Sequence, residues 1–109
     1  MDISEDRKAN SLVLALSGKL DAKTAKTFED RIFGVINSGA QRLVIDLSQL
    51  EYISSSGLRV FLLAAKRLQS ADGKIVLCSM KDHVRQVFDL AGFSSIPIYG
   101  SRDEAMQSL

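Results

Sequence analysis

Residues 42–68 read RLVIDLSQLEYISSSGLRVFLLAAKRL, and this stretch gives the strongest indication of the fold class. Its first six residues are mostly aliphatic and β-branched, which is typical of a strand covered on both faces. We expect residues 48–55 to form a loop and a helix to begin near Ser56. The apolar residues that recur at helical spacing are Leu58, Phe61, Leu62, Ala65 and Leu68. A buried strand followed by an amphipathic helix predicts a βαβ unit and a parallel sheet.

The N-terminal flank adds two strands and a helix to this unit. Residues 3–8 predict a short edge strand, and the apolar run at residues 12–16 predicts a buried strand that pairs with it as a hairpin. Asp21 stands where the N-cap of the next helix belongs. That helix buries Ala25, Phe28, Ile32, Val35 and Ile36 and ends at Gly39.

The C-terminal flank repeats the alternation of strands and helices. Residues 74–78 predict a strand, residues 79–82 a capping box, and residues 84–91 a third helix. Residues 96–99 predict a last strand that proline confines to a sheet edge or a strand start. A second capping box at residues 101–104 opens a final helix, with Ala105, Met106 and Leu109 facing inward.

The expected fold class is therefore α/β, in the order β-β-α-β-α-β-α-β-α. It is a mixed, mostly parallel sheet of about five strands flanked by four helices. The chain has 109 residues, of which 46% are hydrophobic and 25% charged, so we expect residues 1–109 to form one domain.

The composition also excludes classes of function. The net charge of +1 argues against a nucleic-acid-binding protein, which usually carries a marked basic excess. No apolar stretch reaches ~18 residues, and the acidic start lacks the pattern of a signal peptide, so we expect neither a membrane partner nor export. A single cysteine, Cys78, predicts a reducing, cytoplasmic setting and a core position.

Few residues are available for metal or nucleotide chemistry. One histidine, His83, and one cysteine cannot build a histidine-rich or CxxC-type zinc site. Neither GxGxxG nor GxxxxGK[ST] occurs, and no GxSxG nucleophile elbow surrounds the serines. We therefore expect no metal, no cofactor and no enzymatic activity, and we expect His83 to be exposed.

The run Ser54-Ser55-Ser56-Gly57 is the main candidate site. One interpretation is capping, because serine is a good N-cap. The other is that one hydroxyl accepts a phosphate, because free amides and the helix dipole at a helix N-terminus favour negative charge. A phosphate there would leave the domain folded and change the surface that a partner meets.

Asp21 has two interpretations as well. It either caps the first helix, or it lies beside the serine run and binds an arginine of a partner, because loops after neighbouring parallel strands emerge on the same side of a sheet. Asp46, at the end of an apolar strand, is interpreted as structural and bonded to amides near Ser48. Arg59 is either a solvated charge or a group that positions a phosphate.

The apolar stripe of the second helix is wider than one face. Val60, Leu63 and Ala64 extend it. Val60 and Leu63 either belong to the core or form a hydrophobic docking patch beside Ser56.

Several stretches resemble the STAS domain, and most closely the stand-alone bacterial anti-sigma factor antagonists. The resemblance covers nearly the whole chain and is carried by GKLD at residues 18–21, TA at 24–25, LVIDLS at 43–48, YISSSGL at 52–58, AGF at 91–93 and IPIY at 96–99. It implies a small mixed sheet flanked by helices, in agreement with the expected fold.

The resemblance also implies a function, which is partner switching. The unphosphorylated domain binds an anti-sigma factor that is also a serine kinase, and this releases a sigma factor. The kinase phosphorylates the domain with ATP and breaks the complex, and a metal-dependent serine phosphatase reverses the mark. An alternative is a STAS scaffold that does not switch, as a subunit of a stress-sensing or lipid-transport complex.

The resemblance assigns residues too. The family reads Asp-Ser-Ser-Gly-Leu around its target and modifies the second serine, which is Ser56 here, with Ser55 as second candidate. Ser54 replaces the aspartate of many members and so removes a charge beside the switch. Together with the interpretations above, the predicted partner-binding residues are Asp21, Ser54, Ser55, Ser56, Gly57, Arg59, Val60 and Leu63.

Overall fold

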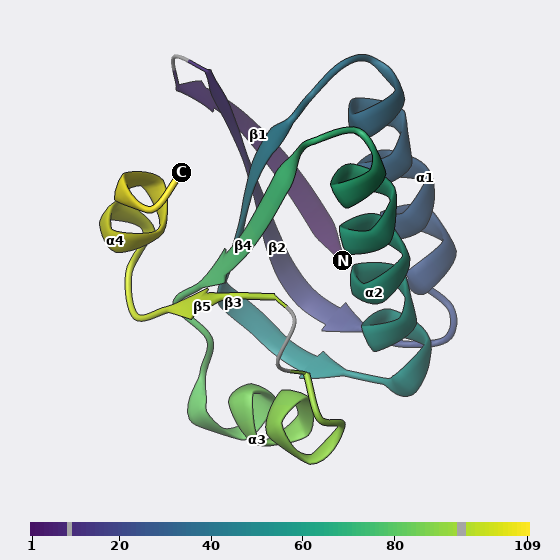
Figure 1. Ribbon diagram of the computed structural model, residues 1–109. Helices are drawn as coiled ribbons and strands as arrows, with labels where there is room; N and C mark the ends of the chain where they lie inside the picture. The colour runs from purple at the N-terminus through teal and green to yellow at the C-terminus, as the bar shows by residue number, and fades with distance from the viewer. Residues whose placement is uncertain (9, 94–95) are drawn as a thin grey trace.

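A five-stranded sheet forms the centre of the molecule, and its strands lie in chain order (Figure 1). The computed structural model describes residues 1–8, 10–93 and 96–109. The strands are β1 (Asp2–Lys8), β2 (Ser11–Leu20), β3 (Arg42–Ile53), β4 (Lys74–Cys78) and β5 (Ile98–Tyr99). β1 pairs with β2 in the antiparallel direction, and the other neighbouring pairs are parallel. The predicted mixed sheet and its opening hairpin are confirmed.

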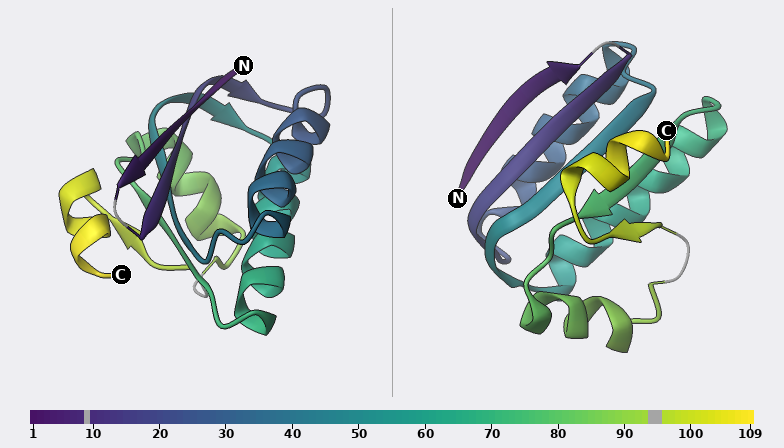
Figure 2. Two further views of the ribbon diagram at one scale, coloured as in Figure 1. Left: turned by 90° about the horizontal axis from the view of Figure 1, so that it is seen from above. Right: turned by 90° about the vertical axis from the view of Figure 1, so that its left-hand side faces the viewer.

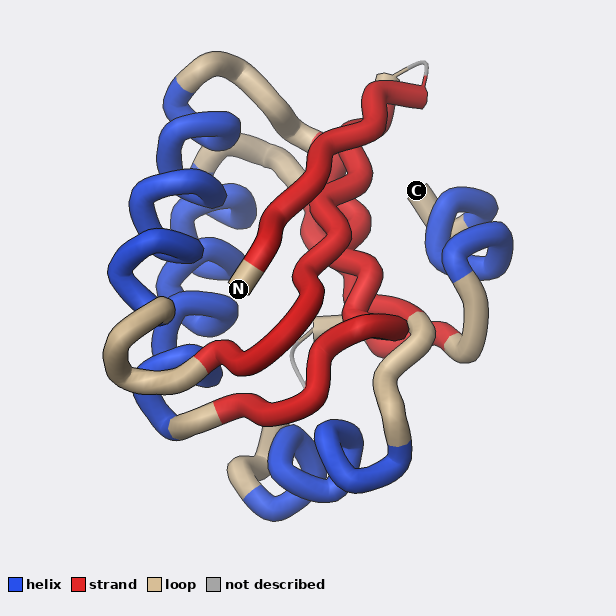
Figure 3. Tube along the Cα trace, turned by 180° about the vertical axis from the view of Figure 1, so that it is seen from behind, coloured by secondary structure: helices blue, strands red, loops and turns tan. Residues whose placement is uncertain are grey.

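Four helices surround this sheet within the described residues, as expected. They are α1 (Ala25–Asn37), α2 (Ser55–Ser70), α3 (Asp82–Leu90) and α4 (Arg102–Gln107). α1 and α2 lie side by side on one face, and α4 crosses the opposite face (Figure 2). α3 lies beyond the end of the sheet at which β2 and β3 finish (Figure 3). The serine run at the start of α2 is therefore at the same end of the molecule as α3.

The two sheet faces build two separate apolar clusters. The larger cluster joins alternate strand residues to α1, α2 and α3. Within it the Phe28 and Phe61 ring centroids are 5.0 Å apart, and those of Phe61 and Phe88 are 5.6 Å apart. The smaller cluster lies under α4. The side-chain alternation of strands thus divides the core into two layers.

One correction concerns residues 48–53, which are strand and not loop. β3 continues to Ile53 and pairs with the last residues of β2. The pairing register shifts twice along this stretch, once beside Gly18, whose φ is +96°. These irregularities disrupt the period-two alternation of the extension, which is why the sequence pattern does not predict it.

The observed starts of two helices also differ from the predicted ones. α1 begins at Ala25, after a turn at residues 22–24. α3 is preceded by Lys81 and has no side-chain cap, so the predicted capping role of Ser79 is wrong. Ser79 instead has a φ of +63°. The Ser101 cap that opens α4 is confirmed, because Ser101 Oγ accepts from the Glu104 amide at 3.2 Å, and the same hydroxyl donates to Glu104 Oε1 at 3.2 Å.

The exposure of individual side chains contradicts one prediction from the sequence and confirms two others. Leu62 was predicted to lie on the apolar face of the second helix, but its side chain is 37% exposed and does not face the core. Cys78 is fully buried and His83 is exposed, as expected. Within residues 1–8, 10–93 and 96–109, none of the helices combines the length and the apolar character that a membrane span requires.

Candidate functional site

Ser54 is the N-cap of α2. Its backbone is extended, with φ −97° and ψ 173°, and its Oγ accepts a hydrogen bond from the Gly57 amide at 3.3 Å. Ser55, Ser56 and Gly57 therefore take the first three positions of the helix, one residue earlier than predicted. The capping interpretation is correct for Ser54. It leaves the hydroxyls of Ser55 and Ser56 outside the cap.

The exposure of the run falls from Ser55 to Gly57. Ser55 is exposed, Ser56 is half-buried, and Gly57 is buried. The first amides of a helix have no acceptor within the helix. Since Ser54 Oγ takes up the amide of Gly57, the amides of Ser55 and Ser56 are the ones that an incoming anion would meet.

Gly57 allows α2 to begin close to β2. A Cβ atom at this position would lie 2.7 Å from Leu20 Cγ and 3.1 Å from Ile53 Cγ1. Leu20 and Ile53 are themselves buried, so neither can swing away. The side chain of any other residue would push the serine run away from the end of β2.

The Asp21 loop lies next to the serine run. Leu20 and Ile53 are partners in the β2–β3 register, and the Ser54 amide donates to the Leu20 carbonyl at 2.9 Å. The prediction that these two loops meet is confirmed, because β2 and β3 are parallel neighbours.

Asp21 forms a compact turn with Thr24. Asp21 Oδ1 accepts from the amides of Lys23 at 3.0 Å and Thr24 at 3.1 Å, and the Asp21 amide donates to Thr24 Oγ1 at 2.9 Å. The Thr24 amide, with the Lys23 amide, lowers the pKa of the Asp21 carboxyl below its ordinary value. The carboxylate is therefore ionised and held in one orientation, while Oδ2 accepts none of these bonds.

Thr24 completes the Asp21 turn, a role that was not predicted from the sequence. Its spacing of three residues after Asp21 is the signal that could have revealed the reciprocal pair, because a side chain three positions into a turn can reach back to the first amide.

The residues of α2 that were predicted to contact a partner differ in their exposure. Arg59 is exposed and Leu63 is half-buried, so both side chains reach the surface. Val60 is 2% exposed and belongs to the large core cluster. The prediction that Val60 contributes to a docking patch is therefore wrong.

Two contacts tie the end of β3 to α3 beside the serine run. Lys81 Nζ pairs with Glu51 Oε1, and His83 Nε2 lies 2.6 Å from the Glu51 carbonyl oxygen. The Lys81 ammonium lowers the pKa of the Glu51 carboxyl. Tyr52, the next residue, is 49% exposed. Because Glu51 and Lys81 are 30 residues apart, no local sequence signal predicts their contact.

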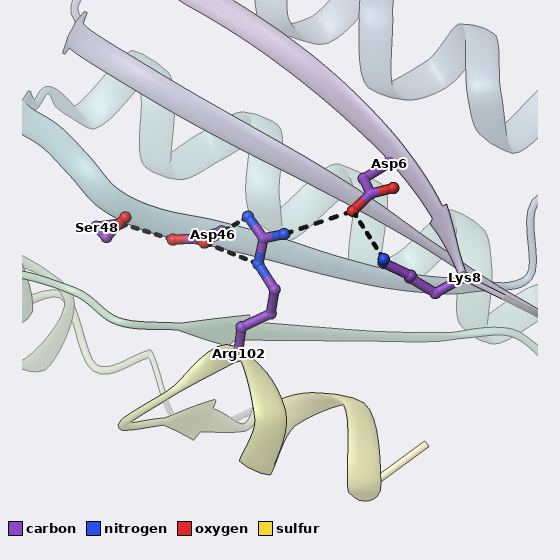
Figure 4. A network of polar contacts seen from close by, with 5 residues as sticks. All are labelled: Asp6, Lys8, Asp46, Ser48 and Arg102. Atoms are coloured by element: carbon purple, nitrogen blue, oxygen red, sulfur yellow. Dashed lines mark hydrogen bonds and ion pairs between the residues drawn. The ribbon is translucent and has the colours of Figure 1, made fainter.

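Asp46 is structural, as predicted, and it has a partner that the sequence did not reveal. Its Oδ1 accepts from the Ser48 amide at 2.9 Å, while Oδ2 accepts from the Arg102 guanidinium (Figure 4). Burial disfavours the ionised form, but these hydrogen bonds outweigh it and lower the pKa of the Asp46 carboxyl.

Fold and site together define a small α/β domain with a serine-capped helix beside an acidic turn. Within the described parts of the chain, no three histidine, cysteine or acidic residues are grouped to hold a metal ion. A sequence model of the STAS domain matches residues 2–105. The chain belongs to the STAS domain family.

Known proteins similar to this chain support that membership. BtrV of Bordetella bronchiseptica, described as a candidate anti-sigma factor antagonist, is 42% identical over 106 residues, covering 96% of this chain and 91% of BtrV. The crystal structure of an anti-sigma factor antagonist from Mycobacterium paratuberculosis matches with a TM-score of 0.90 and 26% identity, covering 98% of this chain and 92% of that one. SpoIIAA in its unphosphorylated form matches with a TM-score of 0.85 over 98% of this chain and 95% of its own, and at 22% identity this likeness shows the fold.

Proposed function

We propose that this chain is an anti-sigma factor antagonist that acts by partner switching. In its unphosphorylated form it binds an anti-sigma factor that is also a serine kinase, and a sigma factor is released. The kinase transfers the γ-phosphoryl group of ATP to Ser56 Oγ and releases ADP, which ends the complex. A metal-dependent serine phosphatase restores the free hydroxyl. The chain is a substrate in this cycle, needs no cofactor of its own and works in the cytoplasm.

The observation that carries the proposal is the position of Ser56 at the start of α2, next to the Asp21 turn. The Ser54–Leu20 hydrogen bond joins the two segments. A phosphate on Ser56 would add about −1.5 to −2 charges beside the ionised Asp21. A partner that docks an arginine against Asp21 would then meet an altered charge pattern.

Two features support Ser56 over its neighbours. Ser54 Oγ accepts the capping bond from Gly57, so a phosphate there would compete with the cap. Ser55 is exposed and is the second candidate. Ser56 corresponds to the modified serine of the family that this chain resembles.

The proposed partner surface consists of the exposed and half-buried residues around this serine. It comprises Asp21, Ser54, Ser55, Ser56, Arg59 and Leu63. Gly57 contributes by letting α2 approach Leu20. The names of relatives such as BtrV support an anti-sigma factor as the partner.

Phosphorylation with an anti-sigma factor serine kinase of the same organism tests the proposal. Incubation with ATP followed by peptide mapping is expected to give one phosphate, on Ser56. Ser56→Ala should abolish it, and the control Ser55→Ala should retain it. Phosphate on the Ser56→Ala protein would move the site elsewhere.

Binding must change with phosphorylation for the switch to operate. Size-exclusion chromatography of the kinase with the unmodified domain should show a complex, and the phosphorylated domain should not form one. A complex that survives phosphorylation would instead favour a non-switching STAS scaffold, such as a subunit of a stress-sensing or lipid-transport assembly.

A further inference from the structure

α4 covers two neighbouring rows of side chains on the sheet face opposite α1 and α2. In one row Val13, Val44 and Val76 are register partners across β2, β3 and β4. In the next row Asp46 and Cys78 are register partners. The three valines and Cys78 are each at most 1% exposed, so this face depends on a cover.

The cover itself is slight. α4 has six residues, and Ala105 is its one fully buried side chain. Met106 and Leu109 pack against the same cluster but are only partly buried. An isolated helix shorter than about 12 residues is not stable in water, so α4 holds its place through contacts with the sheet.

Arg102, the first residue of α4, supplies the main polar contacts. Its Nε and Nη2 lie 3.0 and 2.8 Å from Asp46 Oδ2 on β3, and its Nη1 lies 3.7 Å from Asp6 Oδ2 on β1 (Figure 4). Asp6 also pairs with Lys8 at 3.6 Å. At the other end of the helix, Lys74 Nζ donates to the Ser108 carbonyl at 2.9 Å.

The segment before α4 is attached to the sheet independently. The amides of Leu77 and Ser79 on the β4 side donate to the carbonyls of Pro97 at 2.9 Å and Tyr99 at 3.0 Å. Gly100 and Ser101 then connect β5 to α4. A rotation about this connection would move α4 away without breaking any strand pairing.

We propose that α4 is a latched cover, which opens as a unit while the rest of the domain stays folded. The latch is the ion pair between Arg102 and Asp46. In the closed state α4 hides the valine row and Cys78, and in the open state it exposes them as an apolar strip on the central strands. This inference does not depend on the proposed function, because it concerns the opposite face of the sheet from α1 and α2.

Cys78 is a built-in reporter of this opening. It is the only cysteine of the chain, it is buried, and it lies beside Asp46 in the register. Burial raises the pKa of its thiol, so the closed state should react slowly with thiol reagents.

The test is the rate at which a chromogenic disulfide reagent labels Cys78 in the native protein, measured against urea concentration. For the wild-type chain at low urea, we expect a labelling rate with a much weaker urea dependence than global unfolding, because little surface is exposed when α4 opens. A urea dependence equal to that of global unfolding would overturn the proposal.

Substitution of the latch sharpens this test. Arg102→Met keeps the aliphatic stem and removes the ion pair, and it should raise the low-urea labelling rate at least tenfold. Arg85→Met is the matched control, because it removes an exposed ion pair of α3 with Asp89, and it should leave the rate unchanged. The latch would be contradicted if Arg102→Met raised the labelling rate of Cys78 only by the factor by which it raises the equilibrium constant for global unfolding.

Hydrogen exchange identifies the element that moves. The Ala105 amide, bonded to the Ser101 carbonyl at 3.1 Å, should exchange with the same opening free energy as thiol labelling. The Leu77 amide should remain more strongly protected. If both amides exchange together, β5 opens with α4 and the proposal of a single moving helix is wrong. This comparison uses the wild-type chain, so it decides the matter even if Arg102→Met does not fold.

Discussion

The amide of Ser54 donates a hydrogen bond to the carbonyl of Leu20, with 2.9 Å between nitrogen and oxygen. This bond joins the residue before α2 to the residue before the Asp21 turn. The two segments are 34 positions apart in the chain, and together they form one surface because β2 and β3 are parallel neighbours. A substitution in either segment should therefore alter the position of the other.

The close contact of Gly57 with Leu20 predicts that Gly57→Ala is destabilising. The added Cβ would lie 2.7 Å from Leu20 Cγ, and the overpacking should lower the free energy of unfolding by about 1–3 kcal/mol. Urea denaturation measures the change. Gly34→Ala in α1 is the control, because no atom lies within 4 Å of its added Cβ, and there the better helix propensity should raise stability by about 0.5–1 kcal/mol. Equal effects of both substitutions would refute the steric argument.

The N-cap bond of Ser54 predicts a second stability difference. Ser54→Ala removes the acceptor for the Gly57 amide and should cost about 0.5–2 kcal/mol of unfolding free energy. Ser55→Ala, at the exposed first position of the helix, should change it by less than about 0.5 kcal/mol. The midpoints of two urea titrations give both values. A larger loss of unfolding free energy for Ser55→Ala than for Ser54→Ala would show that Ser54 is not the residue that caps α2.

A negative charge at position 56 should leave the fold intact. In Ser56→Asp the carboxylate meets the positive end of the α2 dipole and should stabilise the domain by about 0.3–1 kcal/mol at low ionic strength, with less effect in high salt. Ser70→Asp places the same charge at the other end of α2 and also removes the Ser70 Oγ bond to the Arg67 carbonyl at 2.8 Å, so stability should fall. Thermal unfolding at two salt concentrations measures both. Unfolding of Ser56→Asp would show that position 56 does not tolerate charge.

The ion pair of Asp46 predicts a pH-dependent contribution to stability. Hydrogen bonds from the Ser48 amide and Arg102 outweigh burial and lower the pKa of the Asp46 carboxyl in the folded state. Its contribution is therefore fully present above the unfolded-state pKa, about 3.9, and is lost as pH falls through the lower folded-state pKa. Asp46→Asn should cost about 1–3 kcal/mol of unfolding free energy at pH 7. The difference from wild type should shrink below about pH 4. A difference that is the same at pH 7 and pH 3 would contradict this assignment.

Local patterns were sufficient for most of the elements. The apolar run of residues 43–47 and the helical spacing from Leu58 onward predict β3 and α2, because strand and helix impose different periods on buried side chains. The serine run and the Ser101 box mark helix starts because their hydroxyls accept amide bonds only a few residues away. These interactions lie within one turn of chain and are therefore visible in the sequence.

Local sequence patterns predicted the order of strands and helices, the placement of the serine run at the start of a helix, and the resemblance to the STAS family. Tertiary packing is needed to explain why β3 extends to Ile53, why Val60 is buried, and why Arg102 reaches Asp46 across 56 positions. The difference arises from the distance along the chain between the residues involved. Three features depend on which elements become neighbours: register shifts, the rotation of a helix against the core, and ion pairs between remote residues. The local periodicity of the sequence contains no information about which elements pack together.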